Sequence, residues 1–329
     1  MELMNKTFSQ LTSKCHTSLR SFYLFLILTI FTSAQVVLIA QSSEFNGLLR
    51  IASYNIENYI VEPSETRPLK SDVSRDKVQD FIKKIDAHII AIQEIGNTNS
   101  LFDLLNGLKA KGMHYQYWFH SGGFDTNIYL ALLSKFPIVN KKAHMNESFL
   151  LHNKRFFVSR GILEADVLLP NKKTITFFVA HLKSRRASTE IDPAELREHE
   201  AAILRKLINK RFAENPSAYI VVVGDMNDTR DSTTLKTIIG RGGTALFDTR
   251  PTEKVKSSLT GNLSGTFKRD IAWTHYYATG DIYSRIDYIL VSKPLQNRLV
   301  RDATFILNDP DWGIASDHRP ITAGFSITD

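Results

Sequence analysis

The sequence predicts an α/β protein in which two sheets pack face to face and helices cover their outer sides. Short apolar runs rich in Ile, Val, Phe and Tyr recur between turn residues, and such runs favour strands. Few of the intervening segments have helical spacing, so we expect most strands to pair directly with one another in packed sheets. The composition, 43% hydrophobic and 23% charged, is typical of a globular protein with a sizeable core.

The N-terminal segment, residues 1–40, differs from the rest. Its polar start carries three cations and one anion, and two apolar runs follow, 22–30 and 36–40. Small residues at 32–34 resemble a cleavage site, which predicts a secretory signal peptide. Alternatively, 22–40 forms one membrane anchor, since a span requires about 20 residues. Both interpretations place the rest of the chain outside the cytoplasm, as a secreted, periplasmic or membrane-anchored protein.

The only cysteine, Cys15, lies in this leader. The mature chain therefore has no disulfide, and cysteine nucleophiles and zinc–thiolate sites are excluded. The whole chain has a net charge of +7, and +5 remains once the three cations and one anion of the leader are removed. This mildly basic balance is a weak indication of a polyanionic or phosphate-bearing substrate.

After a short linker, 41–49, we expect a single domain, 50–329, that acts as a monomer. No repeat or low-complexity tract divides it. The expected strands are 49–54, 89–93, 128–133, 161–169, 174–182, 219–223, 286–291 and 321–327.

Two segments have the spacing of amphipathic helices. Ser74 is the expected N-cap of the first. The second begins with Asp192 as cap, Pro193 in the first turn and Glu195 three residues after the cap. The apolar stripes are Val78, Phe81, Ile82 and Ile85 in the first, and Leu196, Ile203, Leu204, Leu207 and Ile208 in the second.

Polar residues occur at the ends of six expected strands, where a core strand does not need them. A single such residue is usually a turn or cap residue. Because six occur along one chain, we expect them to converge into a cluster of carboxylates, amides and two histidines. They are Asn55, Glu94, His181, Asp225 with Asn227, Asp287, and Asp317 with His318.

Around these positions lie six sequence blocks with a distinctive order and spacing. They are Tyr54-Asn55-Ile56-Glu57, Gln93-Glu94, Ala180-His181-Leu182-Lys183-Ser184, Gly224-Asp225-Met226-Asn227-Asp228, Arg285-Ile286-Asp287-Tyr288 and Ser316-Asp317-His318-Arg319-Pro320. From residue 50 onward the chain resembles the endonuclease/exonuclease/phosphatase superfamily, which includes deoxyribonuclease I and neutral sphingomyelinases. The resemblance implies a four-layer α/β sandwich, with two packed, mainly antiparallel sheets, flanking helices and a site at one rim of the sheets.

Hydrolysis of a phosphodiester requires neutralisation of the nonbridging oxygens, an activated water and help for the leaving oxygen. Carboxylate oxygens suit Mg²⁺, with Mn²⁺ or Ca²⁺ as alternatives. Glu94 is the first expected ligand, and Asp317 faces the same ion. Glu57 is a second metal ligand, or a residue that supports the ligands without touching the ion, or, equally, an exposed acid at a strand end.

Two histidines provide acid–base chemistry near neutral pH. His318 is expected to accept a proton from water while Asp287 holds its other nitrogen. His181 is expected to protonate the leaving oxygen or to stabilise charge in the transition state. The sequence does not decide which histidine is the acid and which is the base.

The amides and cations are expected to hold the phosphate. Asn227 donates a hydrogen bond to a phosphate oxygen, Asp225 positions the nucleophile or assists proton transfer, and Asn55 binds phosphate or orients Asp225. Arg160, Lys183 and Arg185 are expected to contact substrate phosphates, although a basic loop is as often a solvated surface.

The leading functional prediction is an exported metal-dependent phosphodiesterase, an endonuclease acting on nucleic acid. One alternative is a phospholipid phosphodiesterase of sphingomyelinase type or a phosphatase of a small phosphoester. Lipid hydrolysis would need an exposed apolar hairpin near the site, for which Phe156-Phe157 is a small candidate. Another alternative is a non-catalytic binding module on the same fold. The aromatic stretch 268–277 either stacks on bases or packs against the sheet, and Trp312 is expected to pack.

Overall fold

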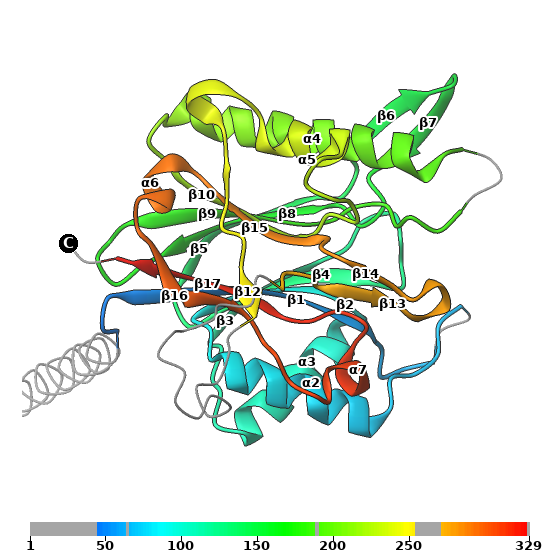
Figure 1. Ribbon diagram of the computed structural model, residues 1–329, viewed down its shortest axis with the longest axis vertical. Helices are drawn as coiled ribbons and strands as arrows, with labels where there is room; N and C mark the ends of the chain where they lie inside the picture. Colours follow the sequence, from blue (N-terminus) through cyan, green and yellow to red (C-terminus); the bar gives the residue numbers. More distant parts are fainter. Residues whose placement is uncertain (1–44, 64–65, 188–190, 254–270, 328–329) are drawn as a thin grey trace, which may run out of the picture. The chain divides into compact units, whose positions relative to one another are not determined.

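The computed structural model of the chain (Figure 1) describes residues 45–63, 66–187, 191–253 and 271–327. The predicted leader, 1–40, lies outside the described residues. No helix within the described ranges combines the length and apolar character that a membrane span requires. The elements below belong to one compact unit that starts at Leu48. Strand β1 also begins at Leu48, so the last two residues of the expected linker, 41–49, belong to the sheet.

The first sheet has seven strands, and it is mixed because β1 pairs antiparallel with β17 and parallel with β2. In spatial order its strands are β12 (Thr252–Glu253), β16 (Leu299–Ile306), β17 (Ile321–Ser326), β1 (Leu48–Tyr59), β2 (Ile89–Ile95), β4 (Tyr129–Ser134) and β3 (Tyr117–Ser121).

The second sheet has six strands, and β10 is parallel to β9 but antiparallel to β15. Two separate two-stranded ribbons accompany the sheets. The sheet order is β11 (Phe247–Asp248), β15 (Asp287–Val291), β10 (Tyr219–Asp225), β9 (Thr174–His181), β8 (Ile162–Leu168) and β5 (Ile138–His144), and the ribbons are β6 (Ser148–Leu151) with β7 (Lys154–Phe157) and β13 (His275–Tyr277) with β14 (Ile282–Ser284).

Helices cover the outer side of each sheet, which gives four layers (Figure 1). The structure confirms the predicted α/β sandwich of two packed sheets with flanking helices. The helices on the first sheet are α2 (Asp72–Ile85), α3 (Thr98–Ala110) and the short α7 (Trp312–Ala315). The helices on the second sheet are α4 (Pro193–Glu214) and α5 (Thr233–Ile239). The remaining elements are connections: α6 (Lys293–Gln296) and the 3₁₀ turns Gly242–Thr244 and Ala278–Gly280.

The core strands are buried on both faces. Tyr54 of β1 packs with Phe81 of α2 in one apolar cluster, while Phe178 of β9 packs with Leu204 of α4 in another. The inner faces of the sheets meet each other, since β1 contacts β10 and β15. Two-sided burial explains why the strands are near-continuous apolar runs rather than alternating ones.

The helix caps agree with the sequence in one case and differ in the other. Asp192 caps α4, with its carboxylate accepting a hydrogen bond from the backbone nitrogen of Ala194 at 2.8 Å, as predicted. The N-cap of α2 is Ser71 and not Ser74. Its hydroxyl accepts from the backbone nitrogen of Ser74 at 3.2 Å, because the helix already begins at Asp72.

Candidate active site

Glu94 sits at a β-bulge near the end of β2. Gln93 pairs with Leu130 and Ile95 pairs with Tyr129, so Glu94 is one extra residue in the ladder. Its φ of 62° lies in the left-handed region, which is uncommon for a residue other than glycine. Bulges of this kind redirect a side chain. Here the bulge gives Glu94 an orientation that a regular strand would not allow.

The end of β1 is irregular in the same way. The register between β1 and β2 shifts between Asn55 and Tyr59, and Glu57 and Asn58 have φ values of 42° and 48°. The backbone nitrogen of Glu57 donates to Oδ1 of Asn55 at 3.1 Å. This bond fixes the side-chain amide of Asn55 and directs its nitrogen into the site.

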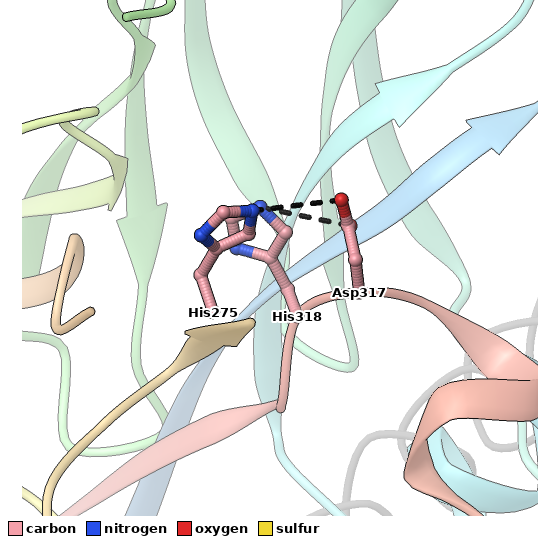
Figure 2. A group of neighbouring side chains, drawn as sticks. All are labelled: His275, Asp317 and His318. Atoms are coloured by element: carbon pink, nitrogen blue, oxygen red, sulfur yellow. Dashed lines mark ion pairs between the residues drawn. The ribbon is translucent and has the colours of Figure 1, made fainter. Parts of the chain in front are cut away.

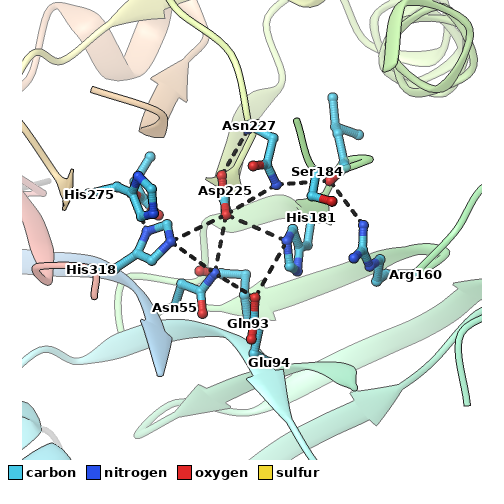
Figure 3. A network of polar contacts seen from close by, with 12 residues as sticks. Asn55, Gln93, Glu94, Arg160, His181, Ser184, Asp225, Asn227, His275 and His318 are labelled. Atoms are coloured by element: carbon cyan, nitrogen blue, oxygen red, sulfur yellow. Dashed lines mark hydrogen bonds and ion pairs between the residues drawn. The ribbon is translucent and has the colours of Figure 1, made fainter. Parts of the chain in front are cut away.

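That amide nitrogen is the centre of the polar cluster (Figure 3). Asn55 Nδ2 lies 3.3 Å from Oε1 of Glu94, 3.1 Å from Oδ2 of Asp225 and 3.4 Å from Nε2 of His318. Asp225 belongs to the second sheet, while the other three residues come from strands of the first sheet or the segment before β17. The site therefore joins the ends of strands from both sheets.

Strand pairing places three of the residues side by side in the second sheet. Asp225 of β10 pairs with His181 of β9 on one side and with Asp287 of β15 on the other. Gly224, one residue earlier, has a φ of 138°, and a Cβ there would lie 1.9 Å from the carbonyl oxygen of Ala180. Only glycine permits this close approach of β9 and β10.

His318 and Asp287 form a buried pair. Nδ1 of His318 lies 2.8 Å from Oδ2 of Asp287, which leaves Nε2 facing Oδ2 of Asp225 at 3.7 Å. Burial alone would lower the pKa of His318, but the charge and hydrogen bond of Asp287, with further help from Asp225, raise it well above its usual range. The neighbouring carboxylates therefore favour the protonated ring of His318.

The pKa of His181 shifts in the opposite direction to that of His318. Its Nε2 lies 3.5 Å from Oδ2 of Asp225 and 3.9 Å from Oε1 of Glu94, and its Nδ1 is buried without a partner among the described residues. Burial, together with the positive charges of Arg160 and His318, lowers the pKa of His181 well below its usual range. Burial raises the pKa of Asp225 to about 7, and the charge of Asp287 adds to this shift.

Asn227 follows the end of β10 in a left-handed conformation, with a φ of 51°. Its backbone nitrogen donates to Oδ1 of Asp225 at 2.8 Å, and its side-chain nitrogen contacts the carbonyl oxygen of Leu182 at 3.0 Å and Oδ2 of Asp225 at 3.3 Å. Asn227 thus holds Asp225 in place and joins the ends of β9 and β10.

A group of carboxylates lies next to this centre. The backbone nitrogen of Asp317 donates to Oε2 of Glu57 at 3.1 Å, and the ammonium of Lys70 donates to the carbonyl oxygen of Glu57 at 2.8 Å. Burial raises the pKa of Glu57, and the charges of Asp317 and Glu94 raise it further. Carboxylate oxygens are the donors that Mg²⁺ or Ca²⁺ takes in proteins. The residues present therefore fit a hard divalent cation.

The three expected phosphate-binding cations lie on the His181 side of the site. Arg160 is buried, donates to the carbonyl oxygen of Leu182 at 3.2 Å and lies 3.7 Å from Asp125. Arg185 donates to the carbonyl oxygen of Asn227 at 2.9 Å and keeps its side chain 42% exposed. Lys183 is fixed through its backbone nitrogen and not through its ammonium, as described below.

Comparison with known proteins identifies the family of this chain. The model of the endonuclease/exonuclease/phosphatase family matches residues 52–318. The chain belongs to this family. Members are hydrolases that act on phosphoester bonds, and they include nucleases, phosphodiesterases and phosphatases. No curated protein matched the chain in sequence.

Solved structures of family members share the fold at low sequence identity. An endonuclease/exonuclease/phosphatase protein from Bacteroides vulgatus is 17% identical, with a TM-score of 0.59 over 85% of this chain and 99% of that one. The catalytic domain of human Nocturnin, with a bound sulfate anion, is 15% identical, with a TM-score of 0.59 over 86% and 95%. Staphylococcus aureus beta toxin is 15% identical, with a TM-score of 0.56 over 84% and 99%.

Sequence reasoning missed Glu200, which supports this family site from helix α4. Its Oε1 accepts hydrogen bonds from the backbone nitrogen and the hydroxyl of Ser159, both at 2.8 Å, and its Oε2 accepts from the backbone nitrogen of Lys183 at 2.6 Å. Glu200 thus ties together the segments that carry Arg160 and His181. In the sequence it is one of several charged residues on a helix, and only its complete burial marks it.

A third histidine, His275, was also missed. It lies inside the aromatic stretch 268–277, and its ring centroid is 4.5 Å from that of His318. The aromatic residues nearby pack on one another, since Trp273 contacts Trp312 at 5.1 Å in an edge-to-face arrangement. Trp312 therefore packs as expected. The stretch 268–277 was expected either to stack on bases or to pack, and Trp273 packs, on Trp312. Residues 254–270 lie outside the described residues.

Proposed function

We propose that this protein is an exported, divalent-metal-dependent phosphodiesterase, most specifically an endonuclease that cleaves nucleic acid with a histidine-activated water. One observation carries the proposal: the amide of Asn55 lies within 3.4 Å of Glu94, Asp225 and His318, which brings a ligand carboxylate, a buried acid and an imidazole to one point. In this proposal, these groups act together on one bound phosphate.

Glu94, with Glu57 and Asp317, would hold Mg²⁺, or Mn²⁺ or Ca²⁺ in its place. When bound, the cation would neutralise the nonbridging oxygens of the phosphate and offset the negative charge that keeps a proton on His318. The backbone irregularities at Glu94 and Glu57 set the direction of these side chains, and the backbone nitrogens of Asn58 and Asp317 donate to their carboxylates at 3.0 Å and 3.1 Å.

The proton acceptor in this proposal is Nε2 of His318. Asp287 holds Nδ1, so the neutral ring has its lone pair on Nε2, toward the centre of the site. The imidazolium that forms when a water proton is taken up is stabilised by Asp287 at 2.8 Å and by Asp225 at 3.7 Å. His318 is thus a general base whose protonated form is stabilised by the carboxylate of Asp287.

On the other side, Asp225 and His181 serve the leaving oxygen. Burial, with the charge of Asp287, raises the pKa of Asp225 to about 7, which suits an acid that can pass a proton toward the leaving oxygen. Neutral His181 lies 3.5 Å away and can donate a hydrogen bond from Nε2. Asn55 and Asn227 hold Asp225 in position, and Arg160 adds positive charge next to the phosphate.

The choice of nucleic acid is supported by a basic segment beside the site. Arg185 and Arg186 are exposed and directly follow the segment that Glu200 ties to the site, and the chain after residue 40 has a net charge of +5. Guanidinium groups near a catalytic phosphate suit a polyanion that extends beyond one phosphate.

A specific observation favours phospholipid as a second candidate substrate. The β6–β7 hairpin projects from the second-sheet side of the molecule (Figure 1), and Leu150 on it is 64% exposed. Phe124, 71% exposed, stacks on Phe157 of the hairpin at 5.4 Å. The next residue, Asp125, pairs with Arg160 at the site. Exposed apolar side chains beside an active site suit a lipid surface.

A substrate panel tests both candidates with the purified protein: supercoiled plasmid, RNA, phospholipid vesicles and a small phosphodiester, each with Mg²⁺, Mn²⁺, Ca²⁺ or a chelator. We expect nicking of the plasmid that the chelator abolishes. Glu94→Gln and His318→Asn should each lower turnover by orders of magnitude without a change in the circular dichroism spectrum.

Each outcome distinguishes between candidates. Hydrolysis of vesicles alone, reduced in a Phe124→Ser/Leu150→Ser variant, would select the phospholipid candidate. Full activity in Glu94→Gln or His318→Asn would overturn the assigned roles. Nucleic-acid binding without hydrolysis of any substrate would show a binding module on this fold.

A further inference from the structure

Three metal-ligating side chains meet beside the catalytic centre, on the side away from His181. Nε2 of His275 lies 3.6 Å from Oδ2 of Asp317, and Nε2 of His318 lies 3.8 Å from Oδ1 of the same carboxylate (Figure 2). One ligand atom from each of the three residues lies within 4.8 Å of the other two. Figure 2 shows that the two imidazoles and the carboxylate point toward one another.

The backbone holds His275 in this place. An isolated antiparallel bridge joins His275 to His318. On either side, the backbone nitrogen of Tyr276 donates to the carbonyl oxygen of Asp317 at 3.0 Å, and that of Arg319 donates to the carbonyl oxygen of Thr274 at 2.7 Å. The position of His275 is thus set by hydrogen bonds to the same segment that carries the other two ligands.

The ligand types indicate which ion would bind. Imidazole nitrogens suit Zn²⁺ and other transition metals, whereas Mg²⁺ prefers oxygen donors. Asp287 accepts a hydrogen bond from Nδ1 of His318, the carboxylate–histidine arrangement that commonly orients a zinc-ligating imidazole. Two histidines and one carboxylate leave a fourth position for water, as in many zinc sites.

We propose that His275, Asp317 and His318 form a Zn²⁺ site that shares Asp317 with the carboxylate site for the activating cation, and that zinc bound there inhibits hydrolysis. The inhibitory part rests on the function proposed above. Zinc on Nε2 of His318 occupies the lone pair that accepts the proton, and it also withdraws Asp317 from Glu57 and Glu94. One ion therefore removes the base and weakens the neighbouring cation site.

Calorimetric titration with ZnCl₂ in saturating Mg²⁺ tests the site whether or not the substrate is known. We expect one high-affinity equivalent for the wild type, weakened more than about tenfold in His275→Asn and in Asp317→Asn. His114→Asn, which removes an exposed histidine elsewhere, is the matched control and should bind zinc as the wild type does. Circular dichroism verifies that each variant is folded.

Activity is then measured against zinc concentration, with each variant normalised to its own rate without zinc. His275→Asn should require at least about tenfold more zinc for half-inhibition. Unchanged zinc affinity in both His275→Asn and Asp317→Asn would overturn the site, as would zinc binding lost in Glu94→Gln but retained in His275→Asn. If no substrate is hydrolysed, the proposed function fails while the titration still reports on the zinc site.

Discussion

The side-chain nitrogen of Asn55 lies 3.1 Å from Oδ2 of Asp225, although the two residues belong to different sheets and are 170 positions apart. This contact is one of the points where the two sheets meet in the site. Asn55 is neutral, so it can be placed between the carboxylates of Asp225 and Glu94 without adding charge. A carboxylate in the same place would lose the hydrogen bond and repel both neighbours.

We therefore predict that Asn55→Asp, which keeps the size of the side chain, lowers kcat/KM by about 10²–10³. Steady-state hydrolysis of the preferred substrate measures the effect. Asn209→Asp, on the exposed face of α4, introduces the same change elsewhere and should have no effect on kcat/KM. Equal activity of Asn55→Asp and wild type would show that this amide has no role in the reaction.

The pairing of Asp287 with His318 predicts a pH dependence. Asp287 raises the pKa of His318, and a base must be neutral to act, so the rate rises with pH through that pKa. Asp287→Asn removes the negative charge, which lowers the pKa of His318. The rising limb of the kcat/KM profile should move to lower pH, while the maximum falls by about 10²–10⁴ because the ring is no longer held in its correct tautomer. A limb that moves to higher pH would contradict the assignment.

We predict that Glu200 affects the reaction by positioning the segments that carry Arg160 and His181. In Glu200→Gln the carboxylate oxygen that accepts from the backbone nitrogen of Lys183 becomes an amide donor, which faces another donor. The segments carrying Arg160 and His181 should separate, lowering kcat/KM by about 10–10². Glu214→Gln on the same helix is the control, since Glu214 is exposed. A loss of stability without a loss of kcat/KM in folded Glu200→Gln would show a purely structural role.

His88 lies far from the site, and its buried ring leads us to predict that the folded protein loses stability in mild acid. Its Nδ1 accepts a hydrogen bond from the backbone nitrogen of Arg50 at 3.0 Å, so the folded protein requires the neutral ring. Burial, with the charges of Arg50 and Lys135, lowers its pKa to about 4. Between about pH 6.5 and about pH 4 the unfolded chain binds the extra proton, so stability falls as pH falls through this window.

At about 1.4 kcal/mol per pKa unit, the fall in the pKa of His88 from 6.5 to about 4 sets an upper limit of about 3.5 kcal/mol for this effect. Urea unfolding at several pH values measures it. In His88→Asn, which keeps an acceptor but cannot titrate in this range, the pH dependence over the window should be smaller by up to that amount. Identical slopes for the two proteins would show that His88 is not the group responsible.

The strands and the site blocks could be predicted because each depends on a short, continuous stretch of sequence. Two-sided burial makes each central strand a run of apolar residues, and a polar residue such as His181 or Asp225 stands out where the run ends. Glu94 was visible for the same reason. Its bulge was not, because the extra residue is defined only by the pairing with β4.

The residues that were missed depend on contacts between distant segments. In the sequence, Glu200 is one charged residue among others on a helix. Its role is visible only in the structure, where three hydrogen-bond donors from two loops surround its carboxylate. His275 lies beside His318 only through backbone hydrogen bonds between the β13–β14 ribbon and the segment before β17. The predicted cap of α2, Ser74, is wrong because a serine can cap a helix at either position and the helix already begins at Asp72, which makes Ser71 the cap.

The extra residue at Glu94 also makes this part of β2 sensitive to length. Deleting that residue would let Gln93 and Ile95 follow each other in an uninterrupted ladder with β4, a change that taken alone favours the sheet. The same deletion would remove the acid that is the first expected ligand of the activating ion. Insertions and deletions in β2 therefore cannot be tolerated as they are in a surface loop, even where they would make the strand more regular.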